Sequence, residues 1–323
     1  MREALFIKKN RERWEEIQSR PSSHPDGMAQ EFTQLVEDLG YSKTFYPNSK
    51  ITHYLNTEAS KRYLAIYSNK KEKRNRFVGL LKYDIPLMVG KHHRLLFISF
   101  CLFVLFVAVG YFSASHDETF VRQVLGNHYV DMTEKNIREG HPFGVYGYGN
   151  GFIMFLGIFI NNLKVSLFEF AGGALLGIPT VFMLMSNAIM VGVFEFMFFN
   201  KGIGGESLLT IMIHGTIELS TFVVSATSGL VLAKSWLFPG RGKRIDALKQ
   251  GAKEGLIIAL SNFPMLLIAA FFEGFITRYA GMPSWLKLLI ITASLLLVIG
   301  YFVVYPIYLK KHLQKQKTSE AWQ

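Results

Sequence analysis

His214 and Glu218 stand four residues apart within an apolar segment, residues 211–233, that is long enough to span a bilayer. At about 100° per residue, a helix places both side chains on one face together with Thr221 and Ser225. Polar groups are costly in hydrocarbon, so this face must meet a protein interior or a wet cavity. We therefore expect the function of the chain to involve this face.

A second polar face is expected in the preceding apolar tract. Asn162, Ser166 and Glu169 recur at intervals of three or four residues, and nearby glycines permit a close helix approach. Asn262 is a further polar position deep in apolar sequence. The polar intramembrane core that the sequence predicts contains Asn161, Asn162, Glu169, Asn187, His214, Glu218, Thr221 and Ser225.

The chemistry of these side chains leaves several interpretations open. His214 and Glu218 can share a metal ion, with Glu169 as a third ligand, but the zinc motif HExxH needs two histidines. We therefore predict no metal site and no cofactor. The same residues could act as acid and base in an intramembrane hydrolase, or form a purely structural hydrogen-bond network. Glu195 and Glu273 lie near the ends of their spans. Both fit ordinary interfacial carboxylates as well as they fit members of the polar core.

Composition places these residues in a membrane protein. Half of the chain is hydrophobic, and after residue 94 the apolar runs are too long and continuous for a soluble core. The predicted fold is all-α, a polytopic α-helical membrane protein with about six transmembrane helices and no cleavable signal peptide. The net charge is +11, but Lys and Arg cluster beside the apolar segments, which indicates topology and anionic lipid rather than nucleic acid.

The distribution of charge predicts the topology. Basic residues gather just before the first span, in residues 234–253 and in the tail 310–323, whereas residues 115–149 carry more acidic than basic side chains. By the positive-inside rule, both termini lie in the cytoplasm and residues 115–149 form an outer loop. The six predicted spans are about 95–114, 163–179, 180–199, 207–233, 252–276 and 285–309.

This topology also places the polar groups in depth. Residues 150–162 are too short to cross comfortably and are expected in the outer interface. The next helix then begins near residue 163, which puts Glu169 about 9 Å below the outer end of its span, opposite Glu218. A re-entrant hairpin at 163–199 that never crosses the membrane leaves the later spans in the same orientation. This alternative therefore remains open.

The organisation before and after the spans is simpler. Helical patterns in residues 1–94 are separated by turn-forming residues at 21–27 and 46–49, which predicts a small cytoplasmic helical domain. The transmembrane domain covers residues 95–309. The basic tail completes the predicted organisation.

Several motifs together resemble one family. They are FIKKNRERWEEI at 6–17, DLGYSKTFYPNSKITHYLN at 38–56, NNLKVS at 161–166, FAGGALLGIPT at 170–180 and HGTIEL at 214–219. In this order they resemble the stage II sporulation protein M family of prokaryotic integral membrane proteins, over nearly the whole chain. The resemblance implies a multi-span protein, and its sporulating members act as scaffolds for peptidoglycan-remodelling machinery. The long N-terminus resembles the broader branch of the family, found also in bacteria that do not sporulate.

The leading functional hypothesis is a non-enzymatic scaffold in the cytoplasmic membrane. Its expected partners are membrane lipid and either other envelope proteins or a second copy of the chain, with no nucleic acid. The alternative is a transporter or exporter permease subunit that moves a small solute, ion or lipid, because six spans with a buried polar face also suit a permease. An intramembrane hydrolase is the third hypothesis, and no nucleophile for it is evident.

Overall fold

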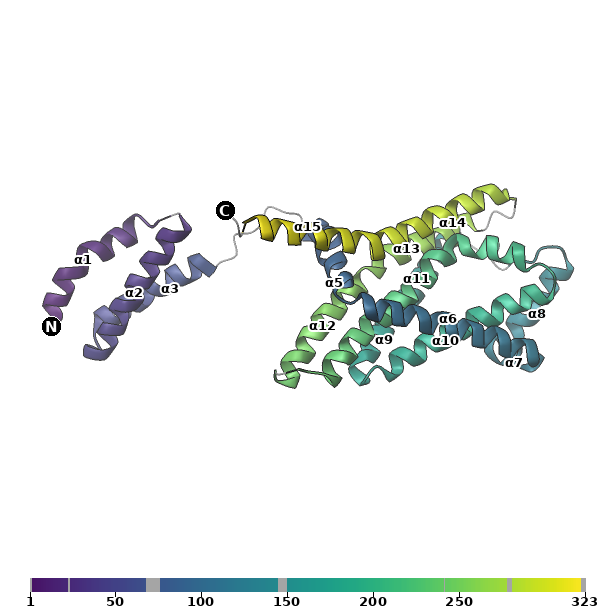
Figure 1. The fold of residues 1–323 in the computed structure, drawn as a ribbon, viewed down its shortest axis with the longest axis horizontal. Coiled ribbons are helices and arrows are strands. Elements are labelled where there is room, and N and C mark those ends of the chain that lie inside the picture. The colour runs from purple at the N-terminus through teal and green to yellow at the C-terminus, as the bar shows by residue number, and fades with distance from the viewer. Residues whose placement is uncertain are drawn as a thin grey trace. The chain divides into compact units, whose positions relative to one another are not determined.

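The computed structural model of the protein describes residues 2–22, 24–67, 76–144, 150–240, 242–277 and 281–320. Throughout these residues the regular elements are helices, which confirms the all-α prediction. The chain divides into two compact units, Met1–Asn75 and Arg76–Gln323. An N-terminal helical domain therefore precedes a larger helical unit, and Figure 1 shows the helices of both.

Three helices form the N-terminal unit, α1 (Glu3–Ser19), α2 (Pro25–Phe45) and α3 (Lys50–Tyr67). Their apolar faces meet in one small core. Trp14 contributes to this core, and its indole Nε1 donates a hydrogen bond of 2.8 Å to Asp38 on α2. The remaining members of the core are Phe6, Ile17, Leu35, Leu55 and Ala59.

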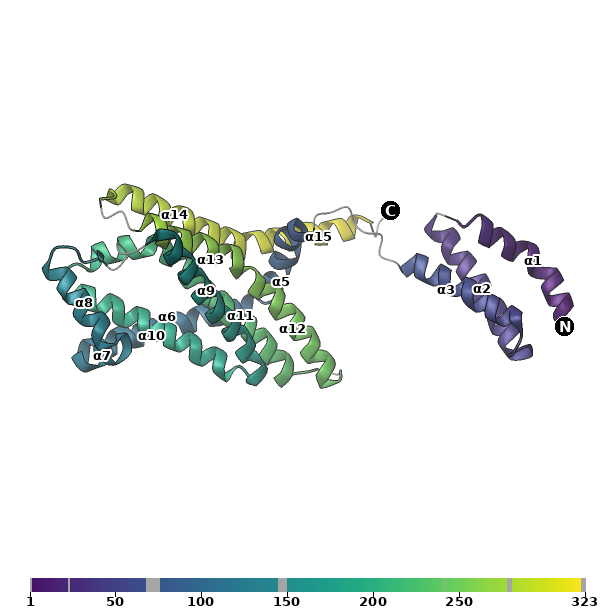
Figure 2. The same cartoon turned by 180° about the vertical axis from the view of Figure 1, so that it is seen from behind.

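The second unit is a helical bundle with six helices that are long and apolar enough to cross a membrane, so the chain is a multi-pass membrane protein. Figures 1 and 2 show the bundle from opposite sides. The crossing helices are α6 (His93–His116), α9 (Gly151–Ala171) with η3 (Gly172–Leu175), α10 (Ile178–Asn200), α11 (Gly204–Leu237), α12 (Arg244–Leu260) with α13 (Asn262–Phe271) and η4 (Phe272–Ile276), and α14 (Ser284–Ile299) with η5 (Gly300–Val304) and α15 (Tyr305–Glu320).

Helix α11 is the centre of this bundle. It contacts α6, α9, α10, α12, α13 and α14, and its middle section is almost entirely buried. A helix that is surrounded by protein can carry polar residues on several faces, because none of them has to meet lipid. The fold therefore places the His214 and Glu218 face inside the protein.

The second crossing helix begins earlier than the sequence predicted. A separate interfacial segment at 150–162 and a span at 163–179 were expected, but α9 starts at Gly151 and continues to Ala171 as one helix. Asn150 caps this start, since its side chain accepts hydrogen bonds from the amides of Phe152 and Ile153. With η3 the helix has 25 residues, about 37 Å and enough to cross hydrocarbon of about 30 Å. This length favours crossing over a re-entrant hairpin.

The predicted outer loop is largely folded. It contains α7 (Glu118–Leu125) and α8 (Asn127–Arg138), and residues 145–149 of it lie outside the described part of the chain. Val121 and Val130 of these helices share a core with Val193, Met197 and Phe198 of α10. Both helices are therefore attached to the bundle by apolar packing.

The membrane unit also begins before the predicted boundary at residue 94. It includes α4 (Arg76–Gly79), η1 (Leu80–Asp84) and α5 (Ile85–Lys91). Ile85 and Val89 are fully buried in the same core as Ile217 and Val224 of α11. The helix that precedes the first span is thus part of the bundle.

A buried histidine at this end of the bundle predicts a dependence of stability on pH. Burial lowers the pKa of His92 even though the neighbouring Glu254 acts in the opposite direction, and Lys91 and Lys234 act with burial. The unfolded chain then binds a proton more readily than the folded one, so stability falls as the pH drops below about 6.5. Between about pH 7.5 and pH 5.5, we expect the thermal unfolding temperature in detergent to fall further for wild type than for His92→Gln. Equal losses would contradict this assignment.

Candidate functional site

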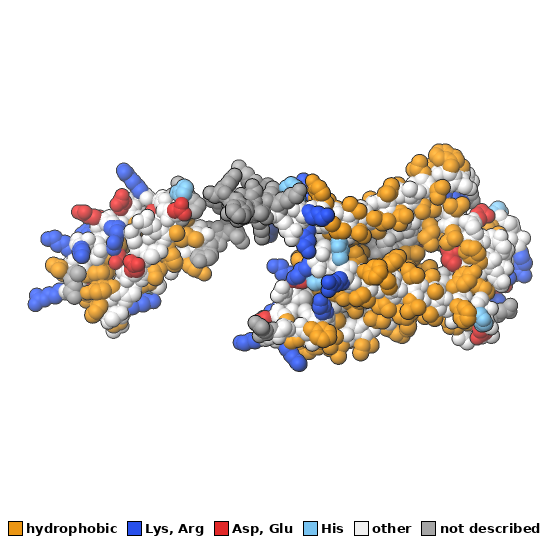
Figure 3. Space-filling view, viewed as in Figure 1, with side chains coloured by type: hydrophobic (Ala, Val, Ile, Leu, Met, Phe, Trp, Pro, Cys, Tyr) orange, Lys and Arg blue, Asp and Glu red, His pale blue; other side chains and the backbone are white. Residues whose placement is uncertain are grey.

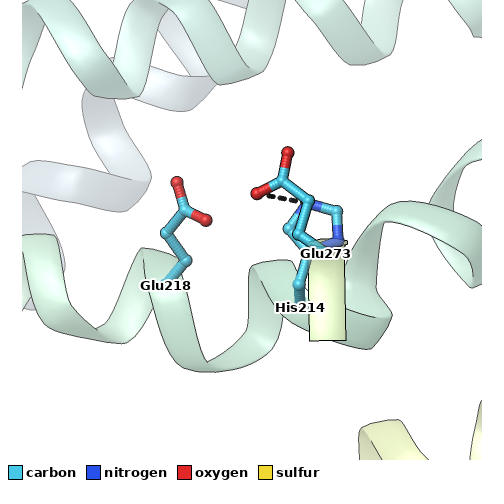
Figure 4. A group of neighbouring side chains, drawn as sticks. All are labelled: His214, Glu218 and Glu273. Carbon is cyan, nitrogen blue, oxygen red and sulfur yellow. Dashed lines mark ion pairs between the residues drawn. The ribbon is translucent and has the colours of Figure 1, made fainter. Parts of the chain in front are cut away.

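Three titratable side chains from two helices converge near the α7–α8 end of the bundle. His214 and Glu218 come from α11, and Glu273 comes from η4, as Figure 4 shows. One nitrogen or oxygen atom from each side chain lies within 4.8 Å of the other two. The His214 Nε2 atom is 3.9 Å from Glu273 Oε2. We call these three residues the His214 cluster.

A π-helical turn positions the third member. At η4 the backbone N–H of Thr277 donates to the carbonyl of Phe272, five residues back, at 2.8 Å. The Thr277 hydroxyl donates to the same carbonyl at 3.1 Å, and its oxygen is 3.1 Å from His214 Nδ1. Single π-helical turns occur frequently at functional sites, because they redirect a side chain within a helix. This turn supplies both Glu273 and the partner that orients the imidazole.

A pocket of about 310 Å³ lies beside the cluster, between α7, α8, α10 and α11. Its polar lining comes from His214, Glu218, Glu195 and Tyr129 among mostly apolar residues. Burial raises the pKa of Tyr129 to about 12, so its hydroxyl group remains protonated well above neutral pH. Gly215 also lines the pocket, and a Cβ there would meet only atoms of its own helix. The glycine therefore keeps space open beside His214 and does not serve helix packing.

Neighbouring polar groups satisfy the hydrogen-bonding capacity of the Glu218 carboxyl group only in part. The Asn162 side chain of α9 interacts with it. Its Oε2 atom is buried and accepts no hydrogen bond from the residues that the structure describes. Burying a carboxylate oxygen without a hydrogen-bond partner costs free energy, so binding of a proton or a cation at this atom is favoured.

A second set of polar side chains lies about two turns further along α11. Asn262 Nδ2 donates to Ser225 Oγ at 2.6 Å and to Ser166 Oγ at 3.0 Å. It also lies 3.3 Å from the carbonyl oxygen of Thr221. We call Ser166, Thr221, Ser225 and Asn262 the central polar network. It joins α9, α11 and α13 through hydrogen bonds inside the bundle.

Several predicted core residues fall into these two sets, and others do not. His214, Glu218 and Asn162 form the cluster and its surroundings, while Thr221 and Ser225 belong to the central polar network. Asn161, next to Asn162, is exposed on the outside of α9. Asn187 is partly buried and donates to the carbonyl of Met183 in its own helix at 2.8 Å.

Glu169 does not lie opposite Glu218, contrary to the prediction. Its backbone carbonyl is beside Gly229 and accepts a hydrogen bond of 2.7 Å from Thr180. Gly229 follows Glu218 by about 16 Å along α11. Because α9 starts at Gly151, Glu169 is near the opposite end of its helix from the pocket. Its fully buried carboxylate has no hydrogen-bond partner within the described residues.

Glu273 takes the place in the cluster that Glu169 was expected to hold, although its position near the end of a span fits an interfacial carboxylate just as well. One signal was present, because Asn262 and Glu273 are eleven residues apart, which is about three turns, and so share a face of one helix. Lys287 was missed entirely. This lysine is buried on α14, and its Nζ donates a hydrogen bond of 3.0 Å to Thr210 Oγ1 on α11.

The central polar network predicts a stability effect. We expect Asn262→Ala to lower the free energy of unfolding by about 1–2 kcal/mol, because the hydroxyl oxygens of Ser166 and Ser225 lose a buried donor. Asn161→Ala is the matched control, since this asparagine is exposed on α9 and should change stability little. Unfolding curves of both variants in detergent give the comparison, and equal stability would contradict a structural role for the network.

Two family models match this chain. The family model of stage II sporulation protein M matches residues 99–278, more than half of the chain. A domain of unknown function (DUF8413) matches residues 4–68, which lie in the N-terminal unit. No curated protein and no solved structure matches the chain. The family is not a known enzyme family. From the match across its spans, the chain belongs to the stage II sporulation protein M family.

Proposed function

We propose that this protein is a non-enzymatic scaffold of the cytoplasmic membrane that holds envelope partners outside the bilayer. The observation that carries the proposal is that α7 and α8 are fixed to the bundle. Phe143, which follows α8, stacks on Phe198 with ring centroids 5.6 Å apart, and Lys201 Nζ is 3.0 Å from Glu134 Oε1 of α8. A rigid surface loses less conformational entropy when it binds a partner than a mobile loop does.

The free face of these two helices is polar. Arg122 pairs with Asp131 at 2.7 Å, and both side chains are largely open to solvent. Lys135 and Glu139 are also exposed and lie 3.9 Å apart. Charged, solvated residues on a fixed surface suit contacts with a protein partner that is itself polar.

The surface charge supports the proposed orientation. Figure 3 shows hydrophobic side chains in a broad band over the spans, with Lys and Arg gathered at the end that contains α5 and the start of α12. A positive end is expected in the cytoplasm. This leaves α7 and α8 on the outside, together with the pocket.

Photo-crosslinking in native membranes tests the scaffold. A crosslinker at exposed Gln123 or Lys135 should yield an adduct with one envelope protein, identified by mass spectrometry. The same crosslinker at Phe112, on the exposed face of α6, should yield lipid. The adduct should weaken in Lys201→Glu, which places two negative charges together at the α8 attachment. Lipid adducts alone at all three positions would contradict the proposal.

A permease subunit is the second candidate, and one observation favours it. Polar side chains follow α11 from the pocket through the His214 cluster to the central polar network. Such a series can bind an ion or solute between helices. Protein-dependent proton flux in proteoliposomes, reduced in His214→Ala and Glu218→Gln, is the expected result for this candidate. Flux that is absent, or equal in both variants and wild type, would exclude a role for these residues in transport.

A further inference from the structure

We propose that the His214 cluster binds a divalent transition metal ion, with Zn²⁺ as the preferred occupant. One imidazole nitrogen and two carboxylate oxygens point into a common space from two helices, as Figure 4 shows. Mixed nitrogen and oxygen ligands of this kind suit zinc better than Mg²⁺, which prefers oxygen ligands alone. The site goes beyond the scaffold function and is independent of it.

The hydrogen bonds around His214 select the nitrogen that would bind the metal. The Thr277 hydroxyl proton is used toward the Phe272 carbonyl, so Thr277 Oγ1 accepts from His214 Nδ1–H. The lone pair is then on Nε2, the atom that faces Glu273 Oε2 at 3.9 Å. A cation placed between Nε2 and this carboxylate oxygen would be bound by both atoms. A hydroxyl that holds the second nitrogen of a metal-binding histidine is a common supporting interaction.

Charge balance supports the same occupant. Two carboxylates in an apolar surrounding are costly, and one divalent cation neutralises both. Glu218 Oε2 provides an independent indication, because it is buried and no described residue donates to it. A metal ion satisfies this atom without any change in the fold.

The present spacing requires only a small adjustment. Ligand atoms around zinc lie about 2.0–2.2 Å from the ion, and therefore about 3.4 Å from one another in a tetrahedral site. The three atoms here lie within 4.8 Å of one another, so side-chain torsions that move each inward by about 1 Å complete the site. The adjacent pocket, kept open at Gly215, leaves the fourth position for water or another ligand.

Metal analysis of purified full-length protein tests the proposal. After removal of any affinity tag and dialysis against Zn²⁺, wild type should retain about one ion per chain by mass spectrometry. Glu218→Gln and Glu273→Gln preserve side-chain shape and should each reduce binding by at least about tenfold. Glu195→Gln is the matched control, because Glu195 lines the same pocket outside the cluster and pairs with Ser207. Dialysis against Mg²⁺ should leave no stoichiometric metal.

A supporting residue provides a second readout. Thr277→Val removes the acceptor for His214 Nδ1–H and should weaken Zn²⁺ affinity by about 10–100-fold without removing a ligand. Zn²⁺ should also raise the thermal unfolding temperature of wild type and of Glu195→Gln, but not of Glu273→Gln, since binding stabilises only a folded site. Zinc well below one ion per chain in folded wild type, or equal retention in Glu218→Gln and Glu195→Gln, would overturn the proposal.

Discussion

Gly192→Val is expected to disrupt the packing of α10 against α6 and to leave most of the protein misassembled. A Cβ at Gly192 would run into the carbonyl oxygen of Val107 and lie 2.8 Å from the amide nitrogen of Tyr111. Gly110 faces the backbone of Ile189 in the same crossing, where a Cβ would meet the Cα at 2.9 Å. These are backbone atoms of a helix and cannot rotate away. We expect the free energy of unfolding to fall by more than about 3 kcal/mol, because the two helices must separate to admit a side chain.

Size-exclusion chromatography and thermal unfolding in detergent measure this effect. Gly157→Val is the matched control, since Gly157 also lies in a crossing helix but has no atom within 4 Å of its Cβ position. This control should remain monodisperse, and valine there exchanges one apolar surface for another. Similar behaviour of the two variants would show that the crossing of α6 and α10 tolerates separation.

Glu254→Ala is expected to loosen α5 from α12 at the opposite end of the bundle. The Glu254 carboxylate lies 2.7 Å from His92 Nε2, pairs with Lys91, and accepts a hydrogen bond of 2.9 Å from Gln250. Removing one partner of a buried pair costs about 3–5 kcal/mol. Here Lys91 is half exposed, so its charge can be hydrated once Glu254 is removed. We therefore expect Glu254→Ala to lower the free energy of unfolding by about 2 kcal/mol.

A double-mutant cycle separates the ion pair from general packing. Lys91→Met and Glu254→Ala should be non-additive in the free energy of unfolding, because each removes the same contact. Glu206→Ala is the control for loss of a carboxylate, since Glu206 is exposed at the start of α11. Additive effects of Lys91→Met and Glu254→Ala would show that contacts other than this ion pair hold α5 against α12.

Much of the candidate site follows from local periodicity. His214, Glu218, Thr221 and Ser225 are within one helix, and helical geometry alone places them on one face. Their burial follows from the cost of polar groups in lipid, and the structure shows α11 surrounded by other helices. Hydropathy likewise predicts six membrane helices, because chain length and apolar content determine which segments can cross. The N-terminal helical domain follows from helical patterns that turn-forming residues separate.

The third member of the cluster required the tertiary structure. Glu169 has the same three-to-four spacing as its neighbours, and its predicted depth depended on where α9 begins. The helix begins twelve residues earlier than predicted, because residues 150–162 continue into α9 as one span. That shift moves Glu169 to the far end of the bundle. Glu273 takes its place through a π-helical turn, which hydropathy and spacing do not reveal.

By itself, the sequence determined the class of the protein, the number of its membrane helices and the face of α11 that carries His214 and Glu218. These properties depend on composition and on the period of a single helix. Only the tertiary structure decided that Glu273 completes the cluster, that Glu169 lies apart from it, and that α7 and α8 close a pocket beside it. Contacts between helices depend on exact helix starts and on distant packing, and an error of three turns moves a side chain by about 16 Å, half of the hydrocarbon thickness.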